Sequence, residues 1–175
     1  MDGGGAAPMR VGQGFDIHRF SGDPGRLLVL GGVTIPGVAG LAGHSDADVV
    51  AHALADALLG AAGLGDLGRH FPDTDPAWAG ADSLMLLAQV TNLVEAKGMT
   101  AVNADCTVVC ERPRLADHTE EMGRRLGAVV RAPVSVKATR AEGLGTLGRV
   151  EGIACLAVAL VAGTDPPAAV TGGDR

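Results

Sequence analysis

The chain is poor in aromatic residues and in cysteine. It has no tyrosine among its 175 residues, and aromatic residues make up 2% of the sequence. The core must therefore be built from small aliphatic side chains. The three cysteines show no CxxC spacing and fall in apolar stretches. This predicts buried free thiols in the reducing cytoplasm, instead of a disulfide framework or a cysteine-based metal site.

Basic residues are also scarce, with 14 Lys and Arg against 20 Asp and Glu, for a net charge of −6. This balance argues against nucleic-acid binding, because a protein needs a basic face to displace counterions. No apolar run reaches the length of a membrane span, and no signal peptide is evident. We therefore expect no nucleic-acid or membrane partner. An anionic substrate would have to find its positive charge locally, from metals, helix N-termini or a few cations.

The length predicts a single domain. Residues 1–10 and 164–175 are rich in Gly, Ala and Pro and are predicted to be flexible tails around a domain at 11–163. Apolar periodicity predicts a strand pair at 26–35, helices at 44–63, 81–98 and 114–130, and strands at 99–110, 134–139 and 150–162. This order predicts an α+β fold, a two-layer sandwich with helices on one face of a mixed sheet. The last strand is apolar on both faces and needs cover on both sides, which a monomer core or an oligomer could supply.

The segment FDIHRF, residues 15–20, places Asp16 and His18 two positions apart between apolar residues. On an extended strand these two side chains project from the same face. A carboxylate beside an imidazole could form a salt bridge, an acid–base pair or part of a metal site.

The predicted helix 44–63 has a polar stripe on an otherwise apolar surface. Ser45 is its predicted N-cap, and Asp48 completes an S-x-x-D capping arrangement. Asp48, His52 and Asp56 follow at i, i+4 and i+8 and share one face. His52 could be a buried histidine bonded to Asp48 or Asp56, or it could be a metal ligand.

The metal alternative joins His52 to Asp16 and His18. Two imidazoles and one carboxylate are a known zinc ligand set that leaves the fourth position for water or substrate. Asp48 or Asp56 would then orient the second nitrogen of His52.

Two neighbouring segments suggest phosphate and polyol recognition. His44 and Ser45 stand at the predicted helix N-terminus, where free N–H groups and the helix dipole favour anions. The loop that follows the helix contains Asp66, Asp73 and Asp75. These carboxylates could belong to a solvated acidic turn or could accept hydrogen bonds from hydroxyl groups of a polyol.

Several long motifs together resemble the 2-C-methyl-D-erythritol 2,4-cyclodiphosphate synthase family of the non-mevalonate isoprenoid pathway. From Val11 to Ala162 the motifs are, in order, FDIHRF, HSDADVVAHALADALLGAAGLGDLG, FPDTDP followed by GADS, ERPRLADH, and KATRAEGLGTLGRVEGIA. The resemblance implies a four-stranded mixed sheet and a homotrimer with active sites between subunits. It also implies intramolecular phosphoryl transfer, in which 4-diphosphocytidyl-2-C-methyl-D-erythritol 2-phosphate closes to the cyclic diphosphate and releases CMP.

The resemblance also implies roles for individual residues. Zinc would be held by Asp16, His18 and His52, and Mg²⁺ or Mn²⁺ by Glu142. Phosphate would contact the zinc ligands together with His44 and Ser45, and His44 would stabilise the transition state. The methylerythritol would be held by Asp66, Leu67, Gly68, Phe71, Pro72, Asp73, Thr74 and Asp75, with Asp66 as a hydroxyl partner. The cytidine phosphate would bind in a pocket formed by two segments. These are Cys110 to Ala116, including Pro113, Arg114 and Leu115, and Thr139 to Glu142.

The sequence departs from the family at two positions. Arg140 stands where a threonine that helps to stabilise the transition state is common. It could take over that catalytic role by neutralising the CMP phosphate, or it could point to solvent. Thr146 stands where a phenylalanine near the trimer axis is frequent, although Arg149 is kept. In relatives this axial cavity can hold an isoprenoid diphosphate.

Two other interpretations share these features. A zinc-dependent hydrolase of a nucleoside-diphosphate-linked polyol would need a placed general base and would release linear products. A non-catalytic zinc-bearing oligomer would close the metal site with a fourth protein ligand, for which His70 and His118 are candidates by residue type.

Overall fold

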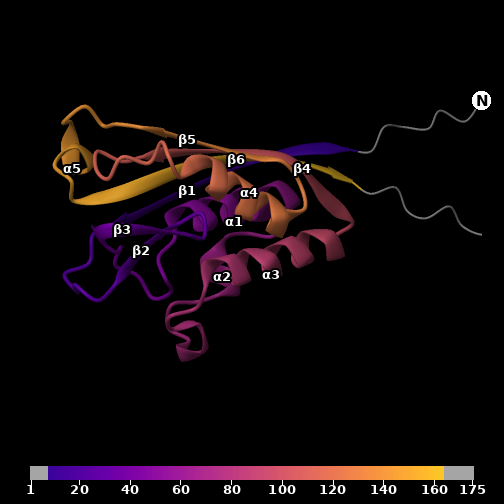
Figure 1. The fold of residues 1–175 in the computed structure, drawn as a ribbon. Helices are drawn as coiled ribbons and strands as arrows, with labels where there is room; N and C mark the ends of the chain where they lie inside the picture. Colours follow the sequence, from indigo (N-terminus) through magenta and orange to yellow (C-terminus); the bar gives the residue numbers. More distant parts are fainter. Residues whose placement is uncertain (1–7, 164–175) are drawn as a thin grey trace, which may run out of the picture.

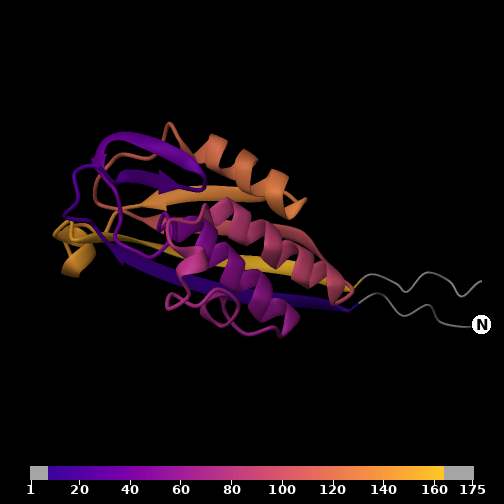
Figure 2. The same cartoon turned by 90° about the horizontal axis from the view of Figure 1, so that it is seen from below.

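The structure is a computed structural model that describes residues 8–163. Its centre is a four-stranded sheet in the order β1-β6-β4-β5, formed by β1 (Met9–Arg19), β4 (Met99–Val109), β5 (Val134–Thr139) and β6 (Gly152–Gly163). Strand β6 pairs antiparallel with β1 and β4, whereas β4 and β5 are parallel. Three helices cover one face of this sheet, namely α1 (Val49–Ala62), α3 (Ser83–Ala96) and α4 (Thr119–Val130) (Figures 1 and 2). The predicted mixed sheet with helices on one face is confirmed.

Shorter elements fill the connections. A hairpin of β2 (Leu27–Leu30) and β3 (Val33–Ala39) confirms the predicted strand pair, and α2 (Leu67–His70) and η1 (Pro76–Trp78) shape the loop after α1. The helix α5 (Gly145–Gly148) joins β5 to β6 at the end of the sheet opposite the start of β1 and the end of β6 (Figure 1).

Several predicted boundaries shift. The helices expected at 44–63 and 114–130 begin later, at Val49 and Thr119, because the preceding residues form loops. Strand β1 begins at Met9, within the segment assigned to the N-terminal tail. The rest of the two predicted tails, residues 1–7 and 164–175, lies outside the described residues.

Glycines in β1 let helix α1 pack directly against the strand backbone. A Cβ atom at Gly12 would lie 1.9 Å from the carbonyl oxygen of Ala57, and one at Gly14 would lie 1.9 Å from that of Ala53. The small residues Ala53, Ala57 and Ala61 follow at i, i+4 and i+8 and form the facing ridge of α1. This close approach brings the side chains that follow Gly14 on the same face of β1 next to α1.

The opposite face of β1 and β6 is apolar and exposed. Phe15 pairs with Leu156 across the two strands, and Val158 lies two residues further along β6. Their exposed fractions are 54%, 38% and 46%. The prediction that β6 is apolar on both faces therefore holds, and within residues 8–163 only the helix-facing side is covered.

Among the described residues, no helix combines the length and the apolar content needed to cross a membrane.

Candidate metal centre and adjoining hollows

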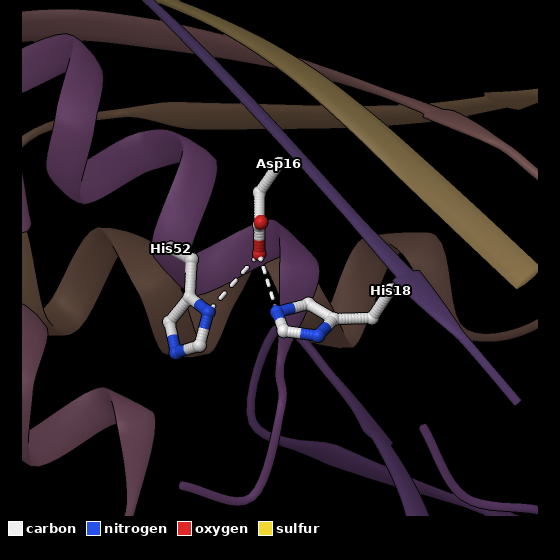
Figure 3. A group of neighbouring side chains, drawn as sticks. All are labelled: Asp16, His18 and His52. Atoms are coloured by element: carbon white, nitrogen blue, oxygen red, sulfur yellow. Dashed lines mark hydrogen bonds and ion pairs between the residues drawn. The ribbon is translucent and has the colours of Figure 1, made fainter. Parts of the chain in front are cut away.

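Asp16, His18 and His52 come together between β1 and α1 (Figure 3). Asp16 and His18 project from the helix-facing side of β1, as the strand geometry predicts, and His52 faces them from α1. Asp16 Oδ2 lies 3.2 Å from His18 Nε2 and 3.0 Å from His52 Nδ1. One ligand atom from each residue lies within 4.8 Å of the others. The three side chains are 12–24% exposed, so one side of the cluster remains open.

The donor set of this cluster fits a divalent cation such as zinc. Nδ1 of His18 lies 2.6 Å from the carbonyl oxygen of Ala42. Because a carbonyl only accepts, Nδ1 carries a proton, and Nε2 is the nitrogen that can bind a cation beside Asp16. Two ligand atoms about 2.0 Å from a tetrahedral metal lie roughly 3.3 Å apart. The separations around Asp16 Oδ2 are close to this value.

The protonation equilibria also favour a cation at this point. Burial raises the pKa of Asp16, but its hydrogen bonds with His18 and His52 outweigh this effect and hold the pKa well below its ordinary value. The hydrogen bond with Asp16 raises the pKa of His18 against the effect of burial. The carboxylate is therefore ionised and attracts positive charge, which a proton or a metal can supply.

The second nitrogen of His52 does not face a carboxylate, contrary to prediction. His52 Nε2 lies 2.8 Å from Ser83 Oγ and 3.2 Å from Ser45 Oγ. The two predicted partners of this nitrogen, Asp48 and Asp56, make other contacts. The Asp56 carboxylate accepts from the N–H of Leu67 at 2.7 Å, and Asp48 is fully buried at the start of α1.

Asp48, and not Ser45, is the N-cap of α1. Its Oδ1 accepts from the N–H groups of Val50 and Ala51, at 3.0 and 3.1 Å. Its two oxygens also accept from Gly31 and Gly32 in the β2–β3 turn, at 2.8 and 2.7 Å. The predicted position of His44 and Ser45 at the helix N-terminus is therefore wrong, and two of the N–H groups there already have the Asp48 carboxylate as acceptor. Phosphate binding by His44 and Ser45 stays a prediction.

His44 and Ser45 instead belong to the loop that precedes α1. Ser45 Oγ accepts from the N–H of Ala47 at 3.1 Å. His44 is exposed, and its Nε2 lies 3.0 Å from the carbonyl oxygen of Asp75. Both residues still line the hollow beside the metal cluster.

This first hollow has a volume of about 540 Å³ and contains the metal cluster. Among the predicted binding residues it is lined by Asp16, His18, His44, Ser45, Leu67, Gly68, Phe71, Pro72 and Asp73. Asp66, Thr74 and Asp75 are not in its lining, and the Asp66 and Asp75 carboxylates cap α2 and η1 by accepting from Arg69 and Ala77. The half-buried Asp56 lines the hollow in addition, and burial raises the pKa of its carboxyl group. The sequence had indicated Asp56 through its position on the same helix face as His52.

A second hollow of about 720 Å³ lies between the loop after β4 and the strand β5. Among the predicted cytidine-pocket residues it is lined by Cys110, Pro113, Arg114, Leu115, Ala116, Thr139 and Arg140. Glu142, Thr146 and Arg149 are not in its lining. Glu142 stands in the following turn with a φ of 51°, Thr146 lies in α5, and Arg149 pairs with Glu151 at 2.6 Å.

Most of the charged side chains that line the second hollow are cationic, although the whole chain is acidic. Arg112, Arg114, Lys137 and Arg140 line it together with the single carboxylate of Glu111. Glu111 accepts from Nε and Nη2 of Arg140. Burial raises the pKa of Cys110 to about 11, so this thiol is a wall group and not a nucleophile. Such a wall is suited to a phosphate-bearing ligand.

The alternative fourth metal ligands are not part of the cluster. His70 Nε2 contacts the carbonyl oxygen of Leu64 at 2.9 Å, and His118 stands at the start of α4. Among residues 8–163 the group that could hold a metal ion consists of Asp16, His18 and His52.

Fold and site together define a class: an α+β protein with a candidate catalytic metal centre and a separate cationic hollow for an anion. The YgbB family model matches residues 9–162. The chain belongs to the YgbB family.

Curated relatives and solved structures agree with this assignment. The chain is 58% identical over 158 residues to 2-C-methyl-D-erythritol 2,4-cyclodiphosphate synthase of Symbiobacterium thermophilum, which covers 89% of this chain and 99% of the relative. The structure of the bifunctional IspDF from Campylobacter jejuni matches with a TM-score of 0.86 and 40% identity, over 91% of this chain and 44% of that longer chain. The IspF (Plasmodium falciparum) CDP complex matches with a TM-score of 0.78 and 29% identity, over 91% of this chain and 99% of that chain.

Proposed function

We propose that this chain catalyses the intramolecular phosphoryl transfer that converts 4-diphosphocytidyl-2-C-methyl-D-erythritol 2-phosphate to 2-C-methyl-D-erythritol 2,4-cyclodiphosphate and CMP. The main support is the full-length similarity to relatives that bear this synthase name. The hollow that contains Asp16, His18 and His52 gives the similarity a chemical basis. In the reaction, an oxygen of the 2-phosphate forms a bond to the β-phosphorus. The bond from that phosphorus to the bridging oxygen breaks, and the electron pair leaves with CMP.

The protein's part in this reaction is positioning and charge neutralisation. Asp16, His18 and His52 would hold zinc, and Glu142 would hold Mg²⁺ or Mn²⁺. When bound, these cations supply charge neutralisation and polarisation of the diphosphate. His44 would donate a hydrogen bond to the phosphate at the open side of the cluster.

The remaining groups of the first hollow would bind the polyol. The Asp56 carboxylate and the exposed Asp73 can accept hydrogen bonds from methylerythritol hydroxyls. Phe71 packs edge-to-face on Trp78, with ring centroids 5.0 Å apart, and gives the hollow a firm apolar wall. Three further predicted residues do not line this hollow and would act indirectly, by shaping the loop after α1: Asp66, Thr74 and Asp75.

The second hollow would receive the cytidine phosphate. The CDP complex of a structural relative supports a ligand of this kind. Arg140 would present the edge of its guanidinium that Glu111 does not engage, and would neutralise the phosphate that departs with CMP.

We also propose a homotrimer whose active sites combine the two hollows from neighbouring subunits. Within residues 8–163, no residue lines both hollows. A substrate that contacts both must therefore extend over the surface of one subunit or bridge two subunits. The exposed apolar face of β1 and β6, with Phe15 and Leu156, offers an area to bury against other subunits. Thr146 and Arg149 would then lie toward the axis, where co-purification of an isoprenoid diphosphate can be checked by mass spectrometry.

Phosphorus NMR of the reaction products tests the proposed reaction. The zinc- and magnesium-loaded chain should release CMP and a cyclic diphosphate, and His52→Ala should release neither. Linear phosphate products would indicate the hydrolase, and no reaction would refute catalysis.

Subunit mixing tests the shared sites. His52→Ala and Arg140→Glu place their defects in different hollows, and neither variant should be active alone. Mixed trimers should regain activity, because some sites then combine two unaltered halves. A monomeric mass, or no recovery in trimers shown to be mixed, would contradict the proposal.

A further inference from the structure

A chain of hydrogen bonds extends behind His52, away from the metal cluster. Ser83, the first residue of α3, is 1% exposed, and its Oγ lies 2.8 Å from His52 Nε2. The same hydroxyl contacts Asp46 Oδ1, while the other oxygen of Asp46 accepts from the N–H of Ser83 at 3.1 Å. The loop before α1 and the start of α3 thus meet at this imidazole.

The direction of this chain follows from the hydrogen-bonding capacity of its members. A carboxylate only accepts, so the single hydroxyl proton of Ser83 is donated to Asp46. The Ser83 oxygen can then only accept, and its partner His52 Nε2 must be the donor. With the Nε2 proton donated to Ser83, the imidazole can give up only its Nδ1 proton when a cation binds beside Asp16 Oδ2, which lies 3.0 Å from Nδ1.

We propose that Asp46 and Ser83 are positioning residues that keep the His52 proton on Nε2 and so leave Nδ1 as the atom that binds the metal beside Asp16. This inference rests on the metal centre proposed above and adds two residues to it. Without the chain, the Ser45 hydroxyl at 3.2 Å is free to donate to Nε2. The imidazole proton would then lie on Nδ1 and block the ligand atom. Outer partners of this kind fix the orientation and basicity of metal-ligating histidines.

Asp46→Asn tests the proposal most sharply, because it keeps the shape and reverses the chain. An amide nitrogen in the place of Oδ1 can donate to Ser83, which then donates to His52 Nε2. The same change removes the bond that Oδ1 accepts from the N–H of Asp48 at 3.2 Å. Two measurements report the effect: nitrogen NMR of the imidazole in the zinc-loaded chain, and zinc affinity by competition with a chelator. We expect the His52 Nε2–H group to lose its hydrogen bond to Ser83 and the zinc affinity to fall by about 10- to 100-fold.

Asp82→Asn is the matched control. Asp82 caps α3 by accepting from Leu84 at 2.8 Å, and it is the residue just before Ser83. The same change at this position should leave the Nε2–H hydrogen bond and the zinc affinity at their wild-type values. A folded Asp46→Asn variant that matches the wild type in both measurements would overturn the proposal.

Asp46 also links the loop before α1 to α3, so Asp46→Asn could prevent folding. In that case Ser83→Ala is the variant that tests the proposal. It removes the acceptor of the His52 Nε2–H without a change of charge, so loss of that hydrogen bond and weaker zinc binding are expected. Wild-type values in this variant would overturn the proposal. Neither measurement needs substrate, so failure of the proposed reaction is a separate result. A wild-type chain that binds no zinc would refute the metal centre and this inference together.

Discussion

Gly14→Ala should weaken both the fold and the metal centre, because Gly14 lets α1 lie against β1. The added Cβ would be 1.9 Å from the carbonyl oxygen of Ala53 and 2.7 Å from the N–H nitrogen of Ala57. Ordinary C···O contacts are roughly 3.3 Å or longer. Helix α1 must therefore move away by more than about 1 Å, since both contacts are to backbone atoms and neither can rotate aside.

The size of the effect follows from that displacement. Overpacking of this kind costs about 1–3 kcal/mol of unfolding free energy. His52 precedes Ala53 on α1, so its Nδ1 would leave the 3.0 Å separation from Asp16 Oδ2. We expect zinc affinity to fall by about tenfold or more, as it does when the support of a ligand is lost. Thermal unfolding and chelator competition measure the two effects.

Gly60→Ala is the matched control on the same helix. The nearest atom to its Cβ is the carbonyl oxygen of Gln13, at 3.9 Å. This variant should be unchanged or up to about 1 kcal/mol more stable, because alanine is the better helix former. A Gly14→Ala chain with wild-type stability and zinc affinity would refute the close-packing argument.

Three further predictions concern other parts of the molecule. Asp48→Ala should lower the unfolding free energy by about 3 kcal/mol in denaturant titration, because four backbone N–H groups lose their acceptor; a loss below 1 kcal/mol would contradict this role. The Lys137 ammonium beside Asp105 holds the pKa of that carboxyl below its ordinary value, so the contact stabilises the fold above about pH 4. Compared with Asp105→Asn, the wild type should be a few tenths of a kcal/mol more stable at neutral pH, after solvent screening. This advantage should disappear as the pH falls through the lowered pKa, and a difference that persists in acid would point to another cause. Glu111→Gln and Arg140→Thr should each weaken CDP binding severalfold in calorimetry. The double variant should bind CDP no more weakly than Arg140→Thr alone. Additive losses of affinity would mean that the two side chains act separately.

The sequence predicted the parts of the site that depend on local periodicity. Alternation along β1 placed Asp16 and His18 on one face, and the apolar period of α1 placed His52 on a single stripe. The motifs around them were specific enough to indicate the family. The mixed sheet followed from the order of strands and helices.

Contacts between distant segments were not predicted. The S-x-x-D pattern suggested Ser45 as the helix cap, but tertiary hydrogen bonds from the β2–β3 turn make Asp48 the better-satisfied acceptor. Ser83 was not among the predicted site residues. Its contact with His52 depends on how α3 packs beside α1, which no local pattern encodes.

The metal centre itself is tested most directly by anomalous diffraction from crystals of the zinc-loaded wild-type chain. The account predicts a zinc peak bound by Asp16 Oδ2, His18 Nε2 and His52 Nδ1, with a fourth position that no protein atom fills. A zinc peak at another place, or a fourth ligand from the polypeptide, would contradict a catalytic metal centre in this hollow.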